Sequence, residues 1–282
     1  MDHDVVVPDV VPAASLGTVR TLVRYPVKSM AGERLDRCAV GMAGLTGDRR
    51  FGIVDAESGR VASAKQPRRW AGLLSMHAAY RGEPSATSVR VTLADGRELG
   101  WADPALIAEL SALSGRPLRL AETPVADVHI DRLATEFDLE PGTEGVIPIG
   151  MASPPGSLFD LAPIHLIAQS TLDALGGDDR RFRPNVVVDA AIPAFGENAW
   201  INRRLHIGAS LTLLVIVATP RCVIPTLAQN DLPGDPTLLK RINAANRVDV
   251  PLVGPSPCVG VYAVVVAPGE IAVGDDVRPE RA

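Results

Sequence analysis

The chain is poor in aromatic residues, and it has no excess of positive charge. Aromatic residues make up 4% of its 282 residues, which argues against a surface that stacks nucleic-acid bases. A formal net charge of −5 argues against binding nucleic acid through an overall positive field. No apolar run approaches the length that spans a membrane. We therefore expect neither a nucleic-acid partner nor a membrane partner.

Cysteine is also scarce. Cys38, Cys222 and Cys258 lie far apart and form no Cys-x-x-Cys pair or Cys/His cluster, which argues against a structural zinc site or an iron–sulfur site. A small, odd number of cysteines fits a reducing compartment. The acidic beginning of the chain has the pattern of neither a signal peptide nor a transit peptide. We therefore expect a soluble cytoplasmic protein.

Length and composition are those of an ordinary globular protein, with 46% hydrophobic and 22% charged residues, and the length favours two domains. Short apolar runs bounded by Gly and Pro predict many strands, and a few stretches with helical spacing predict helices. We expect a mainly β protein with some α (α+β), divided into a tail at 1–15 and domains at 16–128 and 129–282. The predicted strands are 19–25, 34–40, 51–55 with 61–63 as a hairpin, 73–79, 89–93, 161–168, 186–189, 211–218, 259–267 and 271–273; the predicted helices are 104–113, 170–175 and 236–245; and 135–157 is predicted as a long loop.

The predicted helix 104–113 has a sequence signal for its beginning and another for its end. Asp103 precedes Pro104, which suits an N-cap followed by proline at the first helical position, and Gly115 suits the end of the helix.

The segment Thr219-Pro220-Arg221-Cys222 follows the apolar run 211–218, which predicts a buried strand stopped by Pro220. A cation beside a thiol favours the thiolate, the form that attacks electrophiles and binds soft metals. A buried, inert cysteine is the alternative. This segment alone does not distinguish the two.

Two loops combine polar groups with a strand end. Lys28 and Ser29 leave a predicted strand on a loop bounded by Pro26 and Gly32, and an ammonium, a hydroxyl and free amides suit a phosphate. Arg49 follows Asp48 and enters a strand, where a buried charge needs a partner. The alternatives are a surface lysine in a turn and a surface ion pair of little energetic value.

Two further segments are basic. Lys65, Arg68 and Arg69 form a basic patch in the stretch 63–70, which a solvated loop also explains. In the stretch 180–185, Arg183 offers a planar fork for a phosphate or a heterocycle edge, and Asn185 offers both donors and acceptors.

Taken together, these segments resemble the motifs of MOSC-domain proteins. The resemblance rests on the order of Tyr25–Ser29, Gly47–Phe51, Phe182–Asn185 and Pro220–Cys222, and on the closing stretch from Cys258 to Asp275. It covers about residues 16–278. The family includes the mitochondrial amidoxime-reducing component, its bacterial relatives and the C-terminal domain of molybdenum cofactor sulfurase. The resemblance implies an N-terminal β-barrel domain packed on a MOSC β-barrel domain, with a molybdenum–molybdopterin cofactor held between them.

The resemblance also implies roles for individual residues. Cys222 corresponds to the thiolate ligand of molybdenum and to the catalytic centre, and a thiolate is a soft ligand that suits such a metal. Lys28, Ser29 and Arg49 correspond to the phosphate side of the cofactor. The remaining implied cofactor contacts are Arg183, Asn185, Thr219 and Arg221. The stretch 223–226 lacks the Thr-x-Asp pattern of some reductases, which leaves the substrate side open.

The implied function is a molybdenum-dependent reductase of small N-hydroxylated compounds. No plant-type ferredoxin cysteine spacing follows the MOSC motifs, so electrons would come from a separate donor protein. Two alternatives stay open: a sulfur carrier in which Cys222 bears a persulfide, and a cofactor carrier without turnover.

Overall fold

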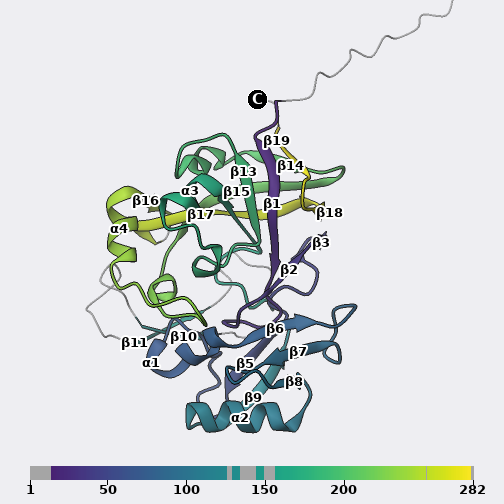
Figure 1. The fold of residues 1–282 in the computed structure, drawn as a ribbon, viewed down its shortest axis with the longest axis vertical. Coiled ribbons are helices and arrows are strands. Elements are labelled where there is room, and N and C mark those ends of the chain that lie inside the picture. Colours follow the sequence, from purple (N-terminus) through teal and green to yellow (C-terminus); the bar gives the residue numbers. More distant parts are fainter. Residues whose placement is uncertain (1–13, 126–128, 134–143, 149–155, 252, 281–282) are drawn as a thin grey trace, which may run out of the picture.

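The computed structural model describes residues 14–125, 129–133, 144–148, 156–251 and 253–280. Its strands form two units, which lie one above the other in Figure 1. The upper unit contains most of the C-terminal half together with the first strand, β1 (Gly17–Arg24). The lower unit contains the elements from β5 (Phe51–Asp55) to β9 (Leu118–Glu122).

The upper unit is a closed barrel. Its seven strands pair in a ring that closes through β12 and β17, in the order β12 (Ile164–Ala168), β13 (Val186–Ala190), β1, β19 (Asp276–Pro279), β14 (Arg204–Ile207), β15 (Leu211–Pro220) and β17 (Gly254–Ala267). Alternate residues such as Leu213, Val215 and Val261 point into one apolar core, as period-two alternation requires. The predicted mainly β class with a barrel is confirmed.

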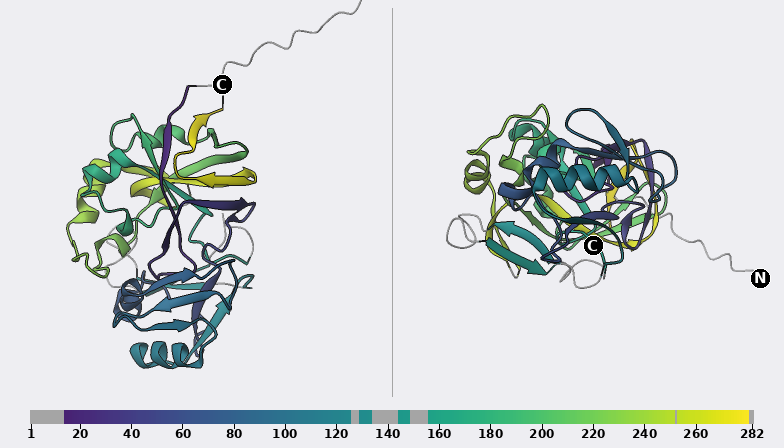
Figure 2. Two further views of the ribbon diagram at one scale, coloured as in Figure 1. Left: turned by 45° about the vertical axis from the view of Figure 1, so that its right-hand side comes forward. Right: turned by 90° about the horizontal axis from the view of Figure 1, so that it is seen from below.

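The lower unit is built from small sheets around a separate core. β5 pairs with β9, and β6 (His77–Tyr80), β7 (Val89–Thr92) and β8 (Glu98–Gly100) form a second sheet. The Phe51 ring lies in this core, with its centroid 5.2 Å from that of Trp101. Figure 2 shows α2 (Pro104–Ser114) on the outer end of the unit.

Both end signals of α2 are confirmed. The Asp103 carboxylate accepts a hydrogen bond from the Ala105 amide at 2.9 Å, and Gly115 ends the helix with φ of 66°.

The other elements cover the barrel or join the two units. They are β2 (Glu33–Leu35), β3 (Arg37–Gly41), β4 (Gly44–Leu45), β10 (His129–Leu133), β11 (Glu144–Pro148), β16 (Arg247–Val250), β18 (Gly269–Ala272), α1 (Pro67–Trp70), α3 (Gln169–Ala174) and α4 (Leu238–Ala245), with 3₁₀ helices at Ala71–Ser75, Asp179–Arg181, Gly196–Trp200 and Ile224–Thr226. Within the described ranges, no helix is both long and apolar enough to cross a membrane.

Several local predictions were wrong. The predicted strand 73–79 is a 3₁₀ helix at Ala71–Ser75 followed by β6, because the consecutive residues Leu73 and Leu74 are both buried in a helical turn. The predicted strand 34–40 divides into β2 and β3.

The predicted hairpin 51–63 is present in shortened form: Val54 and Val61 form a single antiparallel bridge, the Asp55 amide donates to the Arg60 carbonyl at 2.9 Å and the Ala62 amide to the Ile53 carbonyl at 2.8 Å, while β5 makes its long pairing with β9. In the predicted loop 135–157, residues 144–148 form β11, paired with β10, while 135–143 and 149–155 lie outside the described residues. The predicted tail lies outside them up to residue 13.

The two units are not simple halves of the chain. β1 lies in the barrel between β13 and β19, so the chain enters the upper unit first, crosses to the lower unit, and returns. Conversely, Ile130 packs with Val54 and Val61 of the lower unit. The predicted domain boundary between residues 128 and 129 stays a prediction. It divides the sequence, whereas each structural unit contains residues from both sides of it. The crossing places the loop that follows β1 at the junction of the units (Figure 1).

Glu197 supports a pH-dependent prediction outside this junction. Its carboxyl group is fully buried; Thr171 Oγ1 donates to Oε2 at 2.7 Å, and Oε1 has no hydrogen-bond partner among the described residues. Burial raises the pKa of this carboxyl above its ordinary value. The native state therefore binds more protons than the unfolded chain above about pH 4.5, and stability falls as pH rises through the native pKa.

We expect Glu197→Gln to remove this fall and to stabilise the protein by on the order of 1 kcal/mol at pH 8, with a smaller difference at pH 5. Urea unfolding of both proteins at the two pH values measures it. An equal difference in unfolding free energy between the two proteins at pH 5 and at pH 8 would contradict the titration of Glu197.

Candidate functional site

The predicted site residues come together where the two units meet. Lys28 and Ser29 follow β1, Arg49 precedes β5, and Arg183 precedes β13. The Arg49 guanidinium donates to the Arg183 carbonyl at 3.3 Å, and the Arg221 guanidinium donates to the Phe182 carbonyl at 2.9 Å. Segments far apart in the sequence therefore share one region.

Tyr25 lies at the centre of the cationic part of this region. The guanidinium carbons of Arg49 and Arg183 each lie 4.4 Å from the centroid of its ring, a distance typical of cation–π contacts. The Tyr25 hydroxyl donates to the Pro184 carbonyl at 3.1 Å. The aromatic ring thus holds two like-charged groups close to each other.

Arg49 is neutralised by a buried carboxylate. Its guanidinium forms an ion pair with Asp48, whose side chain is 0% exposed. Asp48 also accepts hydrogen bonds from the Tyr25 amide at 2.7 Å and from Asn185 Nδ2 at 3.0 Å. These three contacts satisfy the buried carboxylate and fix the loop that carries Arg49.

The Asn185 side chain forms hydrogen bonds to other parts of the chain. Besides its bond to Asp48, Nδ2 donates to the Val23 carbonyl at 3.2 Å, and Oδ1 accepts from the His165 amide at 3.2 Å. Asn185 therefore ties β1, β12 and the Arg49 loop together. Its predicted direct contact with a cofactor stays a prediction.

Arg183 is different, because its guanidinium makes no hydrogen bond or ion pair with any side chain or carbonyl in the part of the chain that the structure describes. Its guanidinium lies against the Tyr25 ring. Burial lowers the pKa of Arg183 to about 10. A partly buried cation without a carboxylate is unfavourable unless a ligand supplies negative charge. Arg183 is thus the described group best suited to an anion.

Lys28 and Lys65 share one carboxylate. The Lys28 ammonium lies 2.7 Å from Asp160 Oδ1 and donates to the Leu158 carbonyl at 2.9 Å, and the Lys65 ammonium lies 3.1 Å from Asp160 Oδ2. Burial lowers the pKa of Lys28. Burial alone would raise the pKa of Asp160, but the two lysines hold it well below its ordinary value. Two cations against one carboxylate leave a net positive charge.

Cys222 is half-buried at the end of β15 and is a free cysteine. It packs with Leu227 against a small apolar cluster of Ala64, Leu74 and Ile224. Lys65 lies close enough to be affected by it: burial lowers the pKa of Lys65, but Asp160 and Cys222 outweigh this and raise it. The thiol and this lysine of the lower unit are therefore within electrostatic reach of each other.

The sequence did not single out every member of this site. Lys65 was one cation in a patch that a solvated loop also explains, and Asp160 and Tyr262 had no separate signal. Tyr262 is half-buried on β17, and its pKa is raised, first by burial and then by Asp160, against the opposing effect of Arg221 and Lys65. Only the folded chain brings these groups within electrostatic reach of one another.

Two polar atoms beside Cys222 lack partners. Thr219 is fully buried, and its hydroxyl has no hydrogen-bond partner among the described residues; the same holds for Nε of Arg221. Buried polar groups are nearly always hydrogen-bonded in folded proteins. A ligand with polar atoms would satisfy both groups.

Backbone strain gathers at the same place. Six non-glycine residues in the described ranges have positive φ, and three of them are Ser29 (68°), Arg49 (45°) and Arg183 (55°). Ser29 is held there by the Ala64 amide, which donates to its hydroxyl at 3.1 Å. Strained residues of this kind persist where the surrounding structure fixes them, and they gather at ligand sites.

These observations test whether a molybdopterin cofactor fits. Among the described residues the Arg183 guanidinium has no carboxylate partner, and two lysines share the single Asp160 carboxylate. Together with the orphaned Thr219 hydroxyl and the half-buried Cys222 thiol, these groups provide donors for an anionic phosphate and a soft ligand for a metal. The described residues contain no group of three or more His, Cys, Asp or Glu side chains arranged to hold a metal ion. The thiol and the polar groups of this region fit a cofactor in which an organic group carries the metal.

The orphaned Thr219 hydroxyl gives a direct prediction. Replacing Thr219 by valine keeps the β-branched shape and removes a buried hydroxyl without a partner, so we expect the ligand-free protein to gain about 1 kcal/mol in unfolding free energy. Urea unfolding measures the change, with Thr212→Val, whose hydroxyl contacts His206 at 3.0 Å, as a matched control on the same strand. A loss of stability in Thr219→Val would show that the hydroxyl has a partner.

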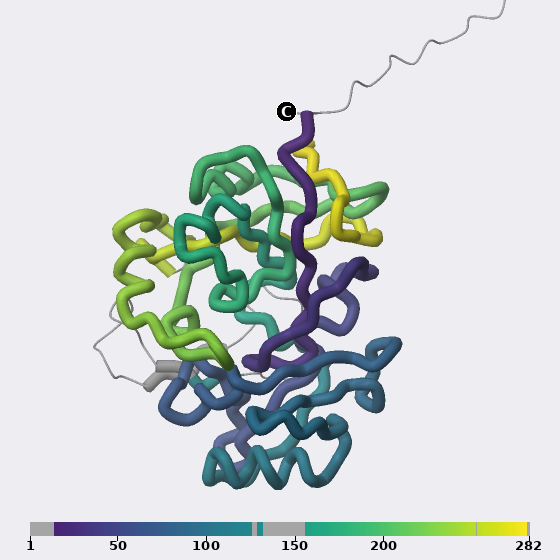
Figure 3. The backbone as a smooth tube through the Cα atoms, viewed as in Figure 1, coloured from purple at the N-terminus to yellow at the C-terminus, as the bar shows by residue number. Residues whose placement is uncertain are grey.

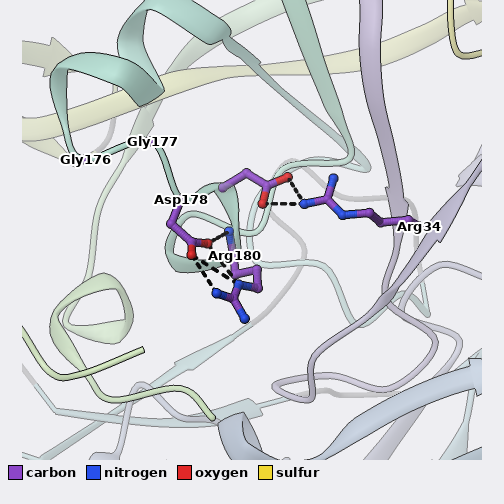
Figure 4. A pocket seen from close by; sticks show the side chains of 6 residues that line it. Arg34, Gly176, Gly177, Asp178 and Arg180 are labelled. Carbon is purple, nitrogen blue, oxygen red and sulfur yellow. Dashed lines mark hydrogen bonds and ion pairs between the residues drawn. The ribbon is translucent and has the colours of Figure 1, made fainter. Parts of the chain in front are cut away.

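One open pocket lies elsewhere. It has a volume of about 620 Å³ and is lined by Arg34, Asp178, Asp179 and Arg180 beside Gly176 and Gly177 (Figure 4). Arg34 donates to both Asp179 oxygens, at 2.9 and 3.1 Å, and Arg180 is paired with Asp178. Its charges are matched, and it contains none of the predicted site residues.

Comparisons with known proteins agree with the motif pattern. The family profile of the MOSC domain matches residues 158–278, and that of the MOSC N-terminal beta barrel domain matches residues 16–101. A crystal structure of the YuaD protein from Bacillus subtilis is 11% identical, with a TM-score of 0.40 over 93% of this chain and 94% of that one. That likeness is too distant to support an argument. Among curated proteins there is no significant match.

Proposed function

Since the chain belongs to the MOSC-domain proteins and carries a MOSC N-terminal beta barrel domain, we propose that it binds a molybdenum cofactor and reduces N-hydroxylated compounds. MOSC domains are associated with molybdenum-cofactor binding, and the family includes oxidoreductases. The observation that carries the proposal is the half-buried Cys222 at the junction of the units, close in sequence to the unpartnered Thr219 hydroxyl and Arg221 Nε.

Each part of the site has a role in holding the cofactor. Cys222 would be the protein ligand of the metal, Arg183 and Lys28 would bind the phosphate, and Arg221 Nε would donate to a polar atom of the organic part, to which the Thr219 hydroxyl would also hydrogen-bond. Asp48 and Asn185 keep the loops in place. When bound, the cofactor supplies two-electron redox chemistry.

The proposed reaction converts N–OH and two electrons with two protons into N–H and water. A separate donor protein supplies the electrons. The chain's own contribution is to bind and orient the substrate beside Cys222 and to keep positive charge near the oxygen that leaves as water. Lys65, whose pKa is raised in part by Cys222, is the ammonium group that would supply this charge.

The reductase activity is tested by supplying the purified, cofactor-loaded protein with a benzamidoxime and a chemical reductant. Formation of the amidine in a Cys222-dependent manner supports the proposal. A loaded protein that turns over no N-hydroxylated or N-oxide compound would instead indicate a cofactor carrier.

A sulfur carrier is the second candidate, because the same half-buried thiol next to Lys65 would stabilise a persulfide anion. Cyanolysis of the protein as isolated distinguishes it. Release of thiocyanate from wild-type protein but not from Cys222→Ser, in samples without molybdenum, would favour sulfur transfer over reduction.

A further inference from the structure

The chain after Cys222 folds back on itself. Residues 223–235, which we call the Cys222 finger, are closed by hydrogen bonds from the Asp235 amide to the Thr226 carbonyl at 2.9 Å and between Gln229 and Leu232 at 3.0 and 2.8 Å. Leu227 of the finger packs on the cluster that also contains Cys222 and Leu74. The yellow-green segment before α4 in Figure 3 follows this path toward the lower unit.

One arginine joins both limbs of the finger. Arg181 Nη1 donates to the Pro225 carbonyl at 3.2 Å, at the base of the finger, and Nη2 donates to the Pro233 carbonyl at 2.7 Å, on the returning limb. The planar fork of a guanidinium points its donors in fixed directions, so one rigid group holds both carbonyls at once. Arg181 belongs to the 3₁₀ helix Asp179–Arg181, directly before Phe182 and Arg183 of the site.

The neighbouring Arg180 offers a comparison. It also reaches the finger, through an ion pair with Asp231 at 2.7 Å, but the two side chains are 44% and 74% exposed. Exposed pairs of this kind contribute little. The half-buried bond of Arg181 to Pro225 is therefore the stronger connection between the 3₁₀ helix and the finger.

We propose that Arg181 is a positioning residue that holds the Cys222 finger against the thiol and thereby sets the space in front of Cys222. The finger supplies Ile224 and Leu227 as an apolar wall beside the thiol, opposite Leu74 of the lower unit. A substrate that reaches Cys222 meets this wall, so the finger selects compounds with an apolar body. The effect on substrates rests on the proposed reductase function; the effect on access to the thiol does not.

The first test measures access to the thiol in the full-length chain prepared without molybdopterin. The rate at which iodoacetamide and a bulky maleimide modify Cys222 is followed by peptide mass spectrometry, which separates it from the buried Cys38 and Cys258. We expect Arg181→Met to react about 5-fold faster or more with the maleimide and less than about 2-fold faster with iodoacetamide. Arg180→Met, the matched control, should react as the wild type does.

The second test uses the loaded enzyme. Arg181→Met should raise KM for a benzamidoxime about 3-fold or more while kcat stays within about 2-fold, because substrate binding and not the chemical step is disturbed. Arg181→Lys should be intermediate in both tests, and it replaces the methionine variant if that protein does not fold.

Equal maleimide rates in wild type, Arg181→Met and Arg181→Lys would overturn the proposal. Faster alkylation without any amidoxime reduction in the wild type would leave Arg181 as the residue that positions the finger and would overturn the reductase function instead.

Discussion

Cys222→Ser is expected to lose molybdenum and to lower amidoxime reduction by more than about 100-fold. Removing a residue that only hydrogen-bonds to a metal ligand typically lowers metal affinity or activity by about 10–100-fold, and Cys222 is the proposed ligand itself. Serine has nearly the same size, and the thiol is only half-buried, so the fold should persist. Metal content and initial rates of the purified variant measure the effect.

The matched control is Cys38→Ala. Cys38 lies in β3, its thiol donates to the Ala39 carbonyl at 3.3 Å, and it packs in the barrel core away from the site. We expect this variant to keep its molybdenum and its rate. Equal losses in both variants would point to a general effect of cysteine removal and not to a ligand.

Arg49→Met is expected to destabilise the protein by about 3–5 kcal/mol. Its guanidinium neutralises Asp48, whose side chain is 0% exposed, and removing one partner of a buried pair leaves an uncompensated charge. Asp48 also holds the Tyr25 amide and Asn185, so the loops around the site should loosen with it. Urea or thermal unfolding of the ligand-free protein measures the loss.

Arg183→Met is the variant to compare with Arg49→Met. Both guanidinium groups contact the Tyr25 ring, but of the two only Arg49 has a carboxylate partner among the described residues. Removing a partly buried cation without a counter-charge should leave the ligand-free protein as stable as the wild type or more stable by up to about 1 kcal/mol. Cofactor retention should fall about 10-fold or more. A destabilisation equal to that of Arg49→Met would contradict the proposed anion role of Arg183.

Local sequence patterns predicted the elements whose signals lie within a few residues. The strand 211–218 and the helix bounded by Asp103 and Gly115 both formed, because apolar alternation and end signals act locally. The predicted strand 73–79 was wrong because the local pattern is ambiguous. Leu73 and Leu74 suit a strand or a turn of helix equally well, and their burial in the folded chain decided between the two.

The site shows what a sequence pattern can and cannot provide. Arg183 and Cys222 lie on short motifs, and the structure places both at the junction of the units. Asp160, Lys65 and Tyr262 share no motif, because they meet only when strands and loops from distant parts of the chain come together. Arg221 was expected to contact the cofactor, which stays a prediction; its guanidinium donates to the Phe182 carbonyl, a contact that the sequence did not indicate.

The most direct test of the central claim is the molybdenum and pterin content of the protein produced in a host that makes molybdopterin. We predict about one molybdenum and one pterin per wild-type chain, with the metal lost from Cys222→Ser and retained by Cys38→Ala. Wild-type protein that contains neither metal nor pterin, or a Cys222→Ser variant that keeps its metal, would contradict the assignment of Cys222 as the ligand.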